Sequence, residues 1–589
     1  MAEKGAFRIE ELASETGYQQ ITELPHSISV TSQKAIDEAL TVLKAHKDSW
    51  VTLGITERVA ILEEITRGMM KVADRWVDAS LEAKGILDNP IGEAEERVLV
   101  ATILRGLRVL RQSLIDILQH GRPQTTGPIT TRQDGQVVAQ VFPRNRIESI
   151  LFRRVTGEVW MEPGVTVEET IEMQAFPYRD RNHKGKIALV LGAGNASALP
   201  VIDSLHKLFV EDQVIVLKLN PVNAYLGPLI EEGFRALIDR GFVRIIYGGI
   251  EQGSYLCYHP AVEEIHLTGS DKTFEAITFG PRLEGEKRKA ERKPLITKRF
   301  TCELGNVSPV IIVPGPWAED DIKEQADHLA TWLVVNAGFG CLTPRVIVQH
   351  KAWAHRDALV EAIGHALSSV QTRKAYYPGA MDRHAIFVAA HPEARQFGDA
   401  IGDHLPWTLI ADVDPSNPGD ICFRREAFCG LFAETALEAS SVTDYIDRAV
   451  EFANNTLWGT LCATLIVHPR SLEDPLVAAS VDRALADLRY GTVLINLFSY
   501  YAAYFMVTPW GGFPGQDIYN IQSGIGKVYN MLMFERPQKS IIRAPFRKPI
   551  DPFTVTSKRA HVFAKRLVQF EASPALWKLP SMLWTAIRS

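Results

Sequence analysis

Apolar residues along the first part of this chain recur three or four positions apart. After Thr31 and Ser32 they fall at Ala35, Leu40 and Leu43, and the same spacing continues through residues 60–72. Side chains at this spacing share one face of a helix, and a Thr-Ser pair ahead of them suits a helix N-cap. The pattern predicts that amphipathic helices dominate the first 120 residues.

Short apolar runs separated by helical segments follow from residue 187. They occupy 187–191, 214–217, 243–247 and 262–267, and the rhythm restarts at 310–313 and 346–348. Uninterrupted apolar strands that alternate with helices are typical of parallel sheets covered on both faces. We therefore expect an α/β fold with two parallel-sheet domains.

Three segments depart from this rhythm. Residues 135–176 are rich in β-branched residues and end near a Pro-Gly turn, which predicts hairpin strands outside the main sheet. Residues 284–293 form a charged run, expected as a solvated loop or, alternatively, an anion contact. The last 50 residues carry five prolines that interrupt long helices, so we expect an appendage there.

Composition narrows the class of protein. A chain of 589 residues with 46% hydrophobic and 23% charged residues has room for two or three domains. No stretch has the roughly 20 apolar residues of a membrane span, and the N-terminus lacks an apolar signal core. Six cysteines without CxxC spacing predict neither a disulfide framework nor a metal site. We expect a cytoplasmic protein in a reducing compartment.

Charge is unevenly distributed. The net charge is −6, yet from Ser540 onward nine Lys or Arg stand against two acidic residues. This tail also contains Trp577 and Trp584, and basic residues mixed with aromatics suit the surface of an anionic membrane. Packing on a sister subunit is the alternative interpretation. We expect no nucleic-acid partner.

Candidate chemistry centres on a thiol and a carboxylate. Glu303 begins the string Glu-Leu-Gly-Asn, and Cys341 lies within Asn-Ala-Gly-Phe-Gly-Cys-Leu-Thr-Pro-Arg. A thiolate is the best side-chain nucleophile for a carbonyl carbon, and a carboxylate can activate the water that cleaves the resulting thioester. A single cysteine is otherwise a small buried hydrophobe, and Glu303 otherwise a surface carboxylate at a strand end.

Seven strings in order resemble the aldehyde dehydrogenase superfamily, with gaps, from about Thr31 to about Gln516. They are residues 194–197, with the family's oxyanion-hole asparagine at Asn195; 216–221, with the cofactor lysine at Lys218; the phosphate turn at 267–270; the Glu303 string; the Cys341 string; Glu426-Ala427-Phe428; and 509–513. The resemblance implies two Rossmann-type domains and a small β oligomerisation element.

The resemblance also implies a division of the chain and a set of partners. Residues 1–134 and 185–302 would form a dinucleotide-binding domain, 135–184 a β-hairpin oligomerisation element, 303–508 a catalytic domain and 509–589 a C-terminal oligomerisation or basic extension. The expected substrate is a small-molecule aldehyde and the expected assembly a homodimer or homotetramer.

Each implied role has a physical reason. Asn195 and the Cys341 backbone N–H can stabilise an oxyanion, while Glu426 and Phe428 resemble a ribose-holding pair. The remaining cofactor candidates include Gly269 and Ser270, where backbone at a helix N-terminus suits phosphate, and Lys218, because a lysine at a strand end suits ribose. Gly249 and Gly253 complete the set, because their spacing resembles that of the family's adenine-side glycines. An ordinary turn or a solvated lysine would explain these residues equally.

Several departures limit the resemblance. Phe274 stands where the family's phosphate turn has a second glycine, and Gly194 replaces a tryptophan before the asparagine. Pro221 replaces an acidic residue that often holds the adenosine ribose, so NADP is as plausible as NAD. The expected protein is a divergent member with a C-terminal extension.

The resulting expectation is NAD(P)-dependent oxidation of an aldehyde to a carboxylic acid through Cys341, Glu303 and Asn195. The aromatic segment 500–506 suggests a bulky or aromatic substrate, with core packing as the alternative. An acylating dehydrogenase that uses coenzyme A would generally lack the Glu303 carboxylate. A non-catalytic scaffold that binds a membrane or partner is the alternative from another class.

Overall fold

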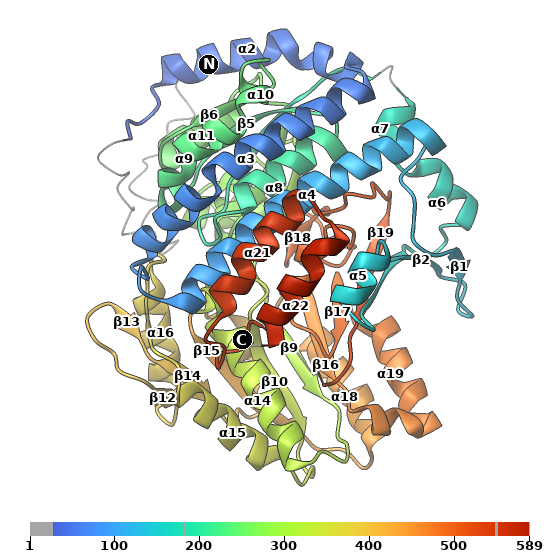
Figure 1. Cartoon of the computed structure of the whole chain (residues 1–589). Coiled ribbons are helices and arrows are strands. Elements are labelled where there is room, and N and C mark those ends of the chain that lie inside the picture. Colours follow the sequence, from blue (N-terminus) through green and yellow to red (C-terminus); the bar gives the residue numbers. More distant parts are fainter. Residues whose placement is uncertain (1–27, 181–182, 548–551, 588–589) are drawn as a thin grey trace.

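The computed structural model describes residues 28–180, 183–547 and 552–587, and it contains two large sheets (Figure 1). The smaller sheet lies beneath the N-terminal helices, and the larger sheet fills the other half of the molecule. This arrangement confirms the predicted mixed α/β class with parallel-rich sheets. No helix of the described residues is long and apolar enough to cross a membrane.

Three long helices open the described chain, as the periodicity predicts. They are α2 (Gln33–Thr52), α3 (Ile55–Lys84) and α4 (Pro90–His120). Ser32 is the N-cap of α2, and its side chain accepts a hydrogen bond from the Ala35 N–H at 3.3 Å. Helix α3 buries an apolar stripe that includes Ile61, Ile65 and Trp76, whereas α4 is buried on all sides between Val100 and Leu107. Residues 1–27 lie outside the described part of the chain.

The smaller sheet has six strands in the order β18-β8-β7-β4-β5-β6. Five of them run parallel: β4 (Ile187–Leu191), β5 (Val214–Lys218), β6 (Val243–Ile246), β7 (Glu264–Thr268) and β8 (Arg299–Glu303), with β18 (Gly524–Ile525) antiparallel at the edge. The first four agree with the predicted runs, and β8 was not predicted. Parallel strands place all their carboxyl ends at one edge of the sheet, where ligands bind in open α/β folds.

Helices cover this sheet between its strands. They are α8 (Leu199–Leu205), the π-helix η1 (His206–Val210), η2 (Pro221–Leu226), α9 (Gly227–Gly233), α10 (Arg235–Ile238), α11 (Ile250–Tyr258), α12 (Asp271–Phe279) and α13 (Arg282–Ala290). The prediction of a loop at 284–293 is therefore wrong over most of this segment. Its charges stabilise helix α13 through pairs such as Arg288 with Glu284, 3.1 Å apart and four residues along.

The larger sheet has eleven strands in the order β1-β2-β3-β19-β17-β16-β9-β10-β15-β14-β12. Its parallel centre consists of β19 (Pro537–Arg543), β17 (Thr492–Ile495), β16 (Cys462–Ile466), β9 (Ser308–Ile312), β10 (Pro344–His350), β15 (Leu431–Leu437) and β14 (Trp407–Ile410), and β12 (Arg395–Phe397) is antiparallel. A separate pair is β11 (Arg373–Lys374) with β13 (His404–Leu405).

The helices around the larger sheet complete the second half. They are α14 (Glu319–Val334), η3 (Val335–Gly338), α15 (Arg356–Ser368), α16 (Ala380–Ala390), α17 (Ile421–Arg424), α18 (Val442–Asn455), η4 (Pro469–Glu473), α19 (Pro475–Asp487) and α20 (Tyr500–Phe505). The strands of the parallel centre are almost wholly buried, which explains their uninterrupted apolar sequences.

The hairpin region is not outside the main sheet, contrary to the prediction. Its strands β1 (Ile129–Thr131), β2 (Val137–Phe142) and β3 (Thr156–Met161) extend the larger sheet through an antiparallel pairing of β3 with β19. The short helices α5 (Arg146–Leu151), α6 (Val167–Met173) and α7 (Phe176–Arg179) flank it. The sequence did not reveal β19 as its partner because that strand lies about 380 residues further along, and pairing across such a separation leaves no local signal.

The C-terminal tail is also not a mere appendage. Its helix α21 (Ala560–Ala572) packs along α4, and η5 (Leu576–Lys578) and α22 (Leu579–Ile587) follow it (Figure 1). Glu571 is 1% exposed and forms ion pairs with Arg105 at 3.1 Å and Arg108 at 2.5 Å. The Tyr504 hydroxyl donates to the same carboxylate at 2.7 Å. A buried ion network therefore ties the tail to the body.

Candidate active site

The predicted site residues of the smaller sheet gather at the carboxyl ends of its strands. Asn195 follows β4, Lys218 ends β5, Gly249 follows β6, Gly269 follows β7 and Glu303 ends β8. Because these strands are parallel and adjacent, residues from widely separated positions in the sequence meet at one edge of the sheet.

Glu303 and Cys341 lie close enough to influence each other's protonation. The Glu303 carboxyl is 4% exposed and interacts with the thiol of Cys341, which lies in the turn between η3 and β10. Glu303 reaches this position as the last residue of β8, and Cys341 as part of the loop that leads into the larger sheet. The two groups thus meet where the two sheets adjoin.

Burial controls the protonation of this pair. It raises the pKa of the Glu303 carboxyl to about 8, although hydrogen bonds with Cys341 and Trp510 oppose the shift. Burial, and then the charge of Glu303, raise the pKa of the Cys341 thiol well above its usual range. The resting pair is therefore largely protonated at neutral pH, and a cationic group beside the sulfur would favour the thiolate.

Asn195 lies against the loop that carries Cys341. Its side-chain amide donates to the carbonyl of Phe339 at 2.8 Å, two residues before the cysteine. The loop adopts left-handed backbone at Asn336 and Ala337, with φ of 51° and 54°. A Cβ on Gly338 would overlap the carbonyl of Cys429, so glycine is required at that turn. These contacts bring the third member of the predicted trio to the same loop.

Two residues that the sequence did not single out hold Asn195 in place. The Asn336 amide donates to the Asn195 carbonyl at 2.7 Å, and the Tyr376 hydroxyl donates to that carbonyl at 2.7 Å. Lys84 donates to the Asn336 side-chain oxygen at 2.9 Å and pairs with Glu96 at 2.5 Å. No local pattern in the sequence predicts this network, because its members come from α4, the end of α3 and two distant loops.

Trp510 is a further residue that sequence reasoning left without a role. It lies within the string 509–513, and its indole N–H donates to the Glu303 carboxylate at 3.1 Å. Trp510 is 1% exposed. The only sequence signal was that a tryptophan stands in an otherwise Gly- and Pro-rich segment.

The structure groups three of the predicted cofactor residues. Lys218 is 8% exposed, and burial lowers the pKa of its ammonium to about 8. A Cβ built on Gly249 would meet no atom within 4 Å, and one on Gly253 would meet only Cε of Lys218 at 3.9 Å. These two glycines, at the first turn of α11, therefore leave open space beside the lysine. Such space and a strand-end cation suit the adenosine side of a dinucleotide.

The predicted phosphate turn has a definite local role. Ser270 is the N-cap of α12, and its hydroxyl accepts from the Thr273 N–H at 3.1 Å. The Gly269 N–H donates to the Glu303 carbonyl at 3.1 Å, which links this turn to the end of β8. Phe274, which replaces the expected glycine, is fully buried and packs against Phe300. Its ring faces the core and forms part of the interior.

Glu426 lies against the Glu303 string, and Phe428 lies near the loop that carries Cys341. Glu426 accepts a hydrogen bond from the backbone of Asn306, and burial raises the pKa of its carboxyl to about 7. A Cβ on Gly305 would overlap this carboxylate, so the close approach requires glycine. Phe428 lies near Phe339, with ring centroids 6.1 Å apart. One oxygen of Glu426 is buried and has no hydrogen-bond partner among the described residues.

The aromatic segment 500–506 packs largely in the interior. Tyr504 is 2% exposed and Phe505 fully buried, and Phe505 stacks on Phe142 with centroids 3.9 Å apart. The Tyr500 hydroxyl is hydrogen-bonded to Thr102 of α4. The core-packing interpretation therefore accounts for most of this segment.

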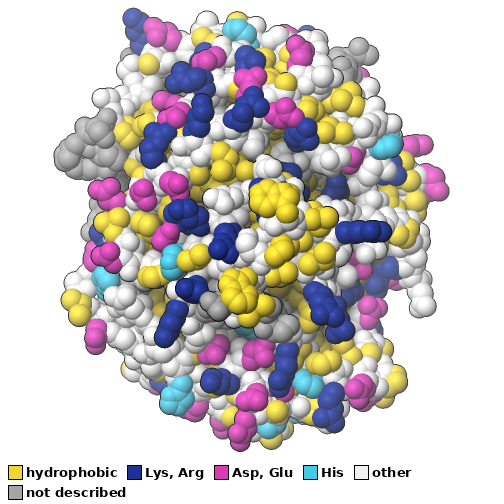
Figure 2. All heavy atoms as spheres, viewed as in Figure 1, with side chains coloured by type: hydrophobic (Ala, Val, Ile, Leu, Met, Phe, Trp, Pro, Cys, Tyr) yellow, Lys and Arg dark blue, Asp and Glu magenta, His cyan; other side chains and the backbone are white. Residues whose placement is uncertain are grey.

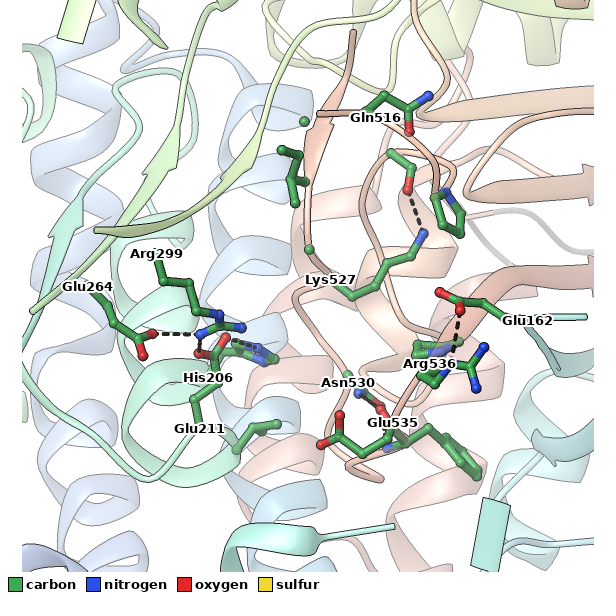
Figure 3. Close-up of a pocket in the computed structure, with 18 of the residues that line it drawn as sticks. Glu162, His206, Glu211, Glu264, Arg299, Gln516, Lys527, Asn530, Glu535 and Arg536 are labelled. Atoms are coloured by element: carbon green, nitrogen blue, oxygen red, sulfur yellow. Dashed lines mark hydrogen bonds and ion pairs between the residues drawn. The ribbon is translucent and has the colours of Figure 1, made fainter. Parts of the chain in front are cut away.

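A cavity of about 520 Å³ lies at the amino-terminal ends of β4, β7 and β8, the opposite edge of the smaller sheet (Figure 3). Arg299 and Glu264 pair at 2.6 Å on one side, and Lys527 donates to the Gly512 carbonyl at 2.8 Å on the other. None of the predicted catalytic or cofactor residues lines it. This cavity is therefore separate from the reactive edge.

Comparison with known proteins agrees with the geometry. Residues 195–383 match the sequence model of the aldehyde dehydrogenase family. An aldehyde dehydrogenase LUC3 from Fusarium sp. is 28% identical over 182 residues, which are 31% of this chain and 32% of that protein. A 4-trimethylaminobutyraldehyde dehydrogenase B from Danio rerio is 34% identical over 110 residues, 18% of this chain and 19% of that protein. The matches thus cover a third or less of these relatives.

Solved structures extend the similarity over most of the fold. An indole-3-acetaldehyde dehydrogenase complexed with NAD+ has a TM-score of 0.56 at 17% identity and covers 86% of this chain and 88% of its own. The glyceraldehyde-3-phosphate dehydrogenase GapN from Methanocaldococcus jannaschii, complexed with NADP, has a TM-score of 0.59 at 16% identity and covers 88% and 98%. The chain thus shares the fold of these aldehyde dehydrogenases over most of its length, and residues 195–383 match the aldehyde dehydrogenase family.

Proposed function

We propose that this protein oxidises an aldehyde to a carboxylic acid with a nicotinamide dinucleotide, through a covalent intermediate on Cys341. The observation that carries the proposal is the contact between the Cys341 thiol and the Glu303 carboxyl. A thiol beside a buried carboxyl whose pKa is raised suits thiol-based acyl chemistry.

The residues present fit a dinucleotide. The unpartnered oxygen of Glu426 can accept a hydrogen bond from a ribose hydroxyl, and the space beside Gly249 and Gly253 admits a ligand next to Lys218. Pro221 offers no carboxylate that would repel a 2′-phosphate, so NADP is as well accommodated as NAD. When bound, the nicotinamide supplies the hydride acceptor.

The ionised fraction of Glu303 takes the proton of the Cys341 thiol and passes it to solvent, and the resulting thiolate attacks the carbonyl carbon of the aldehyde. The carbonyl oxygen gains negative charge in this step, and the Cys341 backbone N–H and the Asn195 amide stabilise it. Because the Asn195 amide donates to Phe339 in the resting site, it must turn toward the substrate or share its second hydrogen. Loss of hydride from the thiohemiacetal leaves a thioester on Cys341.

Glu303 then activates water for hydrolysis of the thioester. Its contact with Cys341 places it beside the acyl sulfur, and a pKa of about 8 gives it the basicity to remove a proton from water. Trp510 fixes one carboxylate oxygen and leaves the other available. Hydrolysis releases the acid and regenerates the thiol.

A panel of aldehydes of varied length and aromaticity, assayed with NAD and with NADP, tests this proposal. We expect reduced dinucleotide and carboxylic acid in equal amounts, and Cys341→Ala should abolish turnover while retaining dinucleotide binding. If acid forms only as a thioester of added coenzyme A, the acylating alternative holds. Absence of both dinucleotide binding and turnover would favour a non-catalytic scaffold.

We also propose that the C-terminal tail contacts an anionic membrane surface. Leu576, Trp577, Trp584 and Ile587 are 63%, 77%, 56% and 64% exposed. Figure 2 shows apolar side chains flanked by basic ones on this face, where α21 and α22 lie in Figure 1. An exposed apolar cluster of this kind marks an interaction surface.

Charge favours lipid over a sister subunit as the occupant of this surface. Lys558, Arg559 and Lys565 are exposed, and Glu571, the only acidic residue within 552–587, is buried. We expect the full chain to sediment with phosphatidylserine vesicles more strongly than with phosphatidylcholine vesicles. The double variant Trp577→Ser, Trp584→Ser should lose that binding without a change in mass by light scattering.

The opposite result, dissociation of a dimer or tetramer without any change in vesicle binding, would assign the tail to subunit contact. A homodimer or homotetramer is part of the proposal either way, and light scattering of the parent protein measures it.

A further inference from the structure

Three metal-ligand side chains meet where α16 ends and α17 begins, outside the residues assigned above. His391 is the C-cap of α16, Asp420 is the N-cap of α17 and Cys422 lies in its first turn. One ligand atom from each lies within 4.8 Å of the others, and within the described residues this is the one such group found. His391 is 9% and Cys422 3% exposed.

We propose that His391, Asp420 and Cys422 bind a divalent transition-metal ion of the Zn²⁺ class. The His391 Nε2 and Asp420 Oδ1 atoms are 3.1 Å apart. Two ligands at 2.0–2.2 Å from a tetrahedral ion are about 3.3 Å apart, so this separation needs only a small adjustment. Thiolate and imidazole donors favour Zn²⁺ over Mg²⁺ or Ca²⁺.

Glu393 supplies the outer contact that such a site requires. Its carboxylate lies 2.8 Å from Nδ1 of His391 and is 59% exposed. A carboxylate on one ring nitrogen holds the hydrogen there, which leaves Nε2 free to bind a metal and fixes the ring orientation. The exposure of Glu393 also shows that solvent borders the site, so water can complete a tetrahedral ion that has three protein ligands.

Metal binding would neutralise this cluster. One Zn²⁺ balances the Asp420 carboxylate and the Cys422 thiolate, while His391 binds as a neutral imidazole. A thiol must lose its proton to bind a metal ion, so metal binding releases this proton into solvent and metal affinity should rise with pH.

The position of the site gives it a consequence for Glu426 and Phe428. Helix α17 leads directly into these residues, and Arg383 of α16 donates to the carbonyls of Ala427 and Phe428, both at 3.2 Å. A metal ion would fix the two helices at a second point. We therefore expect a structural ion that orders the segment bearing Glu426 and takes no part in the chemistry.

Cobalt titration of the chelator-treated full-length protein tests the proposal. Co²⁺ should bind at one ion per chain and produce the near-ultraviolet band of a cobalt–thiolate bond, together with visible bands of a tetrahedral ion. Cys422→Ser should remove the thiolate band, whereas Cys341→Ser should retain it. Added Zn²⁺ should displace Co²⁺ and erase the spectrum.

Three further variants separate a metal site from a hydrogen-bonded helix cap. Glu393→Gln should weaken Co²⁺ binding about tenfold or more, because outer contacts of metal-bound histidines have effects of this size. Glu438→Gln, which removes a carboxylate that is 79% exposed, is the matched control and should leave binding unchanged. If Cys422→Ser fails to fold, Asp420→Asn is tested in its place.

No Co²⁺ uptake, or a thiolate band that survives in both Cys422→Ser and Asp420→Asn, would overturn the assignment. The three side chains would then serve only to cap the two helices through hydrogen bonds. This outcome is independent of the aldehyde chemistry, since the spectra are recorded without substrate or dinucleotide.

Discussion

The indole N–H of Trp510 donates a hydrogen bond to Oε1 of Glu303 at 3.1 Å, although 207 residues separate them in the chain. Trp510 arrives from the segment that follows α20, and Glu303 from the end of β8. The bond stabilises the ionised carboxylate in a buried environment that otherwise favours its protonated form. The pH dependence of the proposed hydrolysis therefore depends on a residue outside the catalytic trio.

Trp510→Phe should shift the pH dependence of thioester hydrolysis upward. Removal of a hydrogen bond to the charged form raises the pKa of Glu303 further above its value of about 8, and a bond to a charged group accounts for about one unit. Hydrolysis requires the ionised form, so its midpoint should move to higher pH. Steady-state rates between pH 6 and 10 measure the shift.

Trp407→Phe is the matched control for this variant. Trp407 is also 1% exposed, and its indole donates to the Val370 carbonyl at 3.1 Å. Trp407→Phe removes the same ring volume and one hydrogen bond as Trp510→Phe, but it leaves the contacts of Glu303 unchanged. An equal shift in both variants would show that the loss of core packing, and not the loss of the Trp510 hydrogen bond, changes the midpoint of the pH dependence.

Glu303→Gln should stall the enzyme after hydride transfer. The amide cannot accept the proton of the attacking water, so the thioester persists and steady turnover falls about a hundredfold or more. Rapid-mixing experiments should show a burst of reduced dinucleotide equal to the enzyme concentration. Cys341→Ala should show no burst at all, and steady turnover in Glu303→Gln would remove this carboxylate from its assigned role.

Dinucleotide binding should weaken as pH rises through about 8. Burial lowers the pKa of Lys218 to about 8, so the ammonium is charged below that pH and neutral above it. If the charged form donates to the ribose, titration of binding by fluorescence should show this decline in the parent protein. Lys218→Met should bind the dinucleotide more weakly and lose the pH dependence near 8. If the pH profile of binding is unchanged in this variant, Lys218 does not contact the ligand.

Glu571→Gln should destabilise the protein by about 3 kcal/mol, because it leaves Arg105 buried without its full countercharge. Burial alone would raise the pKa of Glu571, but Arg108 and Arg105 lower it overall. The stability from this group is therefore present above the usual glutamate pKa and lost as pH falls through the lowered value. Urea unfolding at pH 7 and at pH 3 should show a difference that narrows at low pH.

Glu438→Gln serves as the surface control for this measurement. Its carboxylate is 79% exposed and pairs with Lys351 at 2.6 Å, and exposed pairs contribute about 0–1 kcal/mol. A comparable loss in both variants would mean that the tail network contributes no more than a solvated pair. Retention of the parent stability in Glu571→Gln would show that α21 is held by its apolar contacts alone.

Local sequence determined the elements and the chemical groups. Residues 187–191 and 214–217 form strands because uninterrupted apolar runs bury both faces of a strand. Ser32 begins a helix because its hydroxyl caps free N–H groups. The candidates Cys341, Glu303 and Asn195 could likewise be named, since their residue types and local strings carry the resemblance.

Only the tertiary structure decided which groups meet. The pairing of β3 with β19 and the bond from Trp510 to Glu303 each join segments that are far apart along the chain, and His391 meets Cys422 across the segment between α16 and α17. Such contacts depend on strand order and helix packing, which no local spacing encodes. The burial that raises the pKa of Glu303 is also a property of the folded molecule, because desolvation arises only when distant segments exclude water.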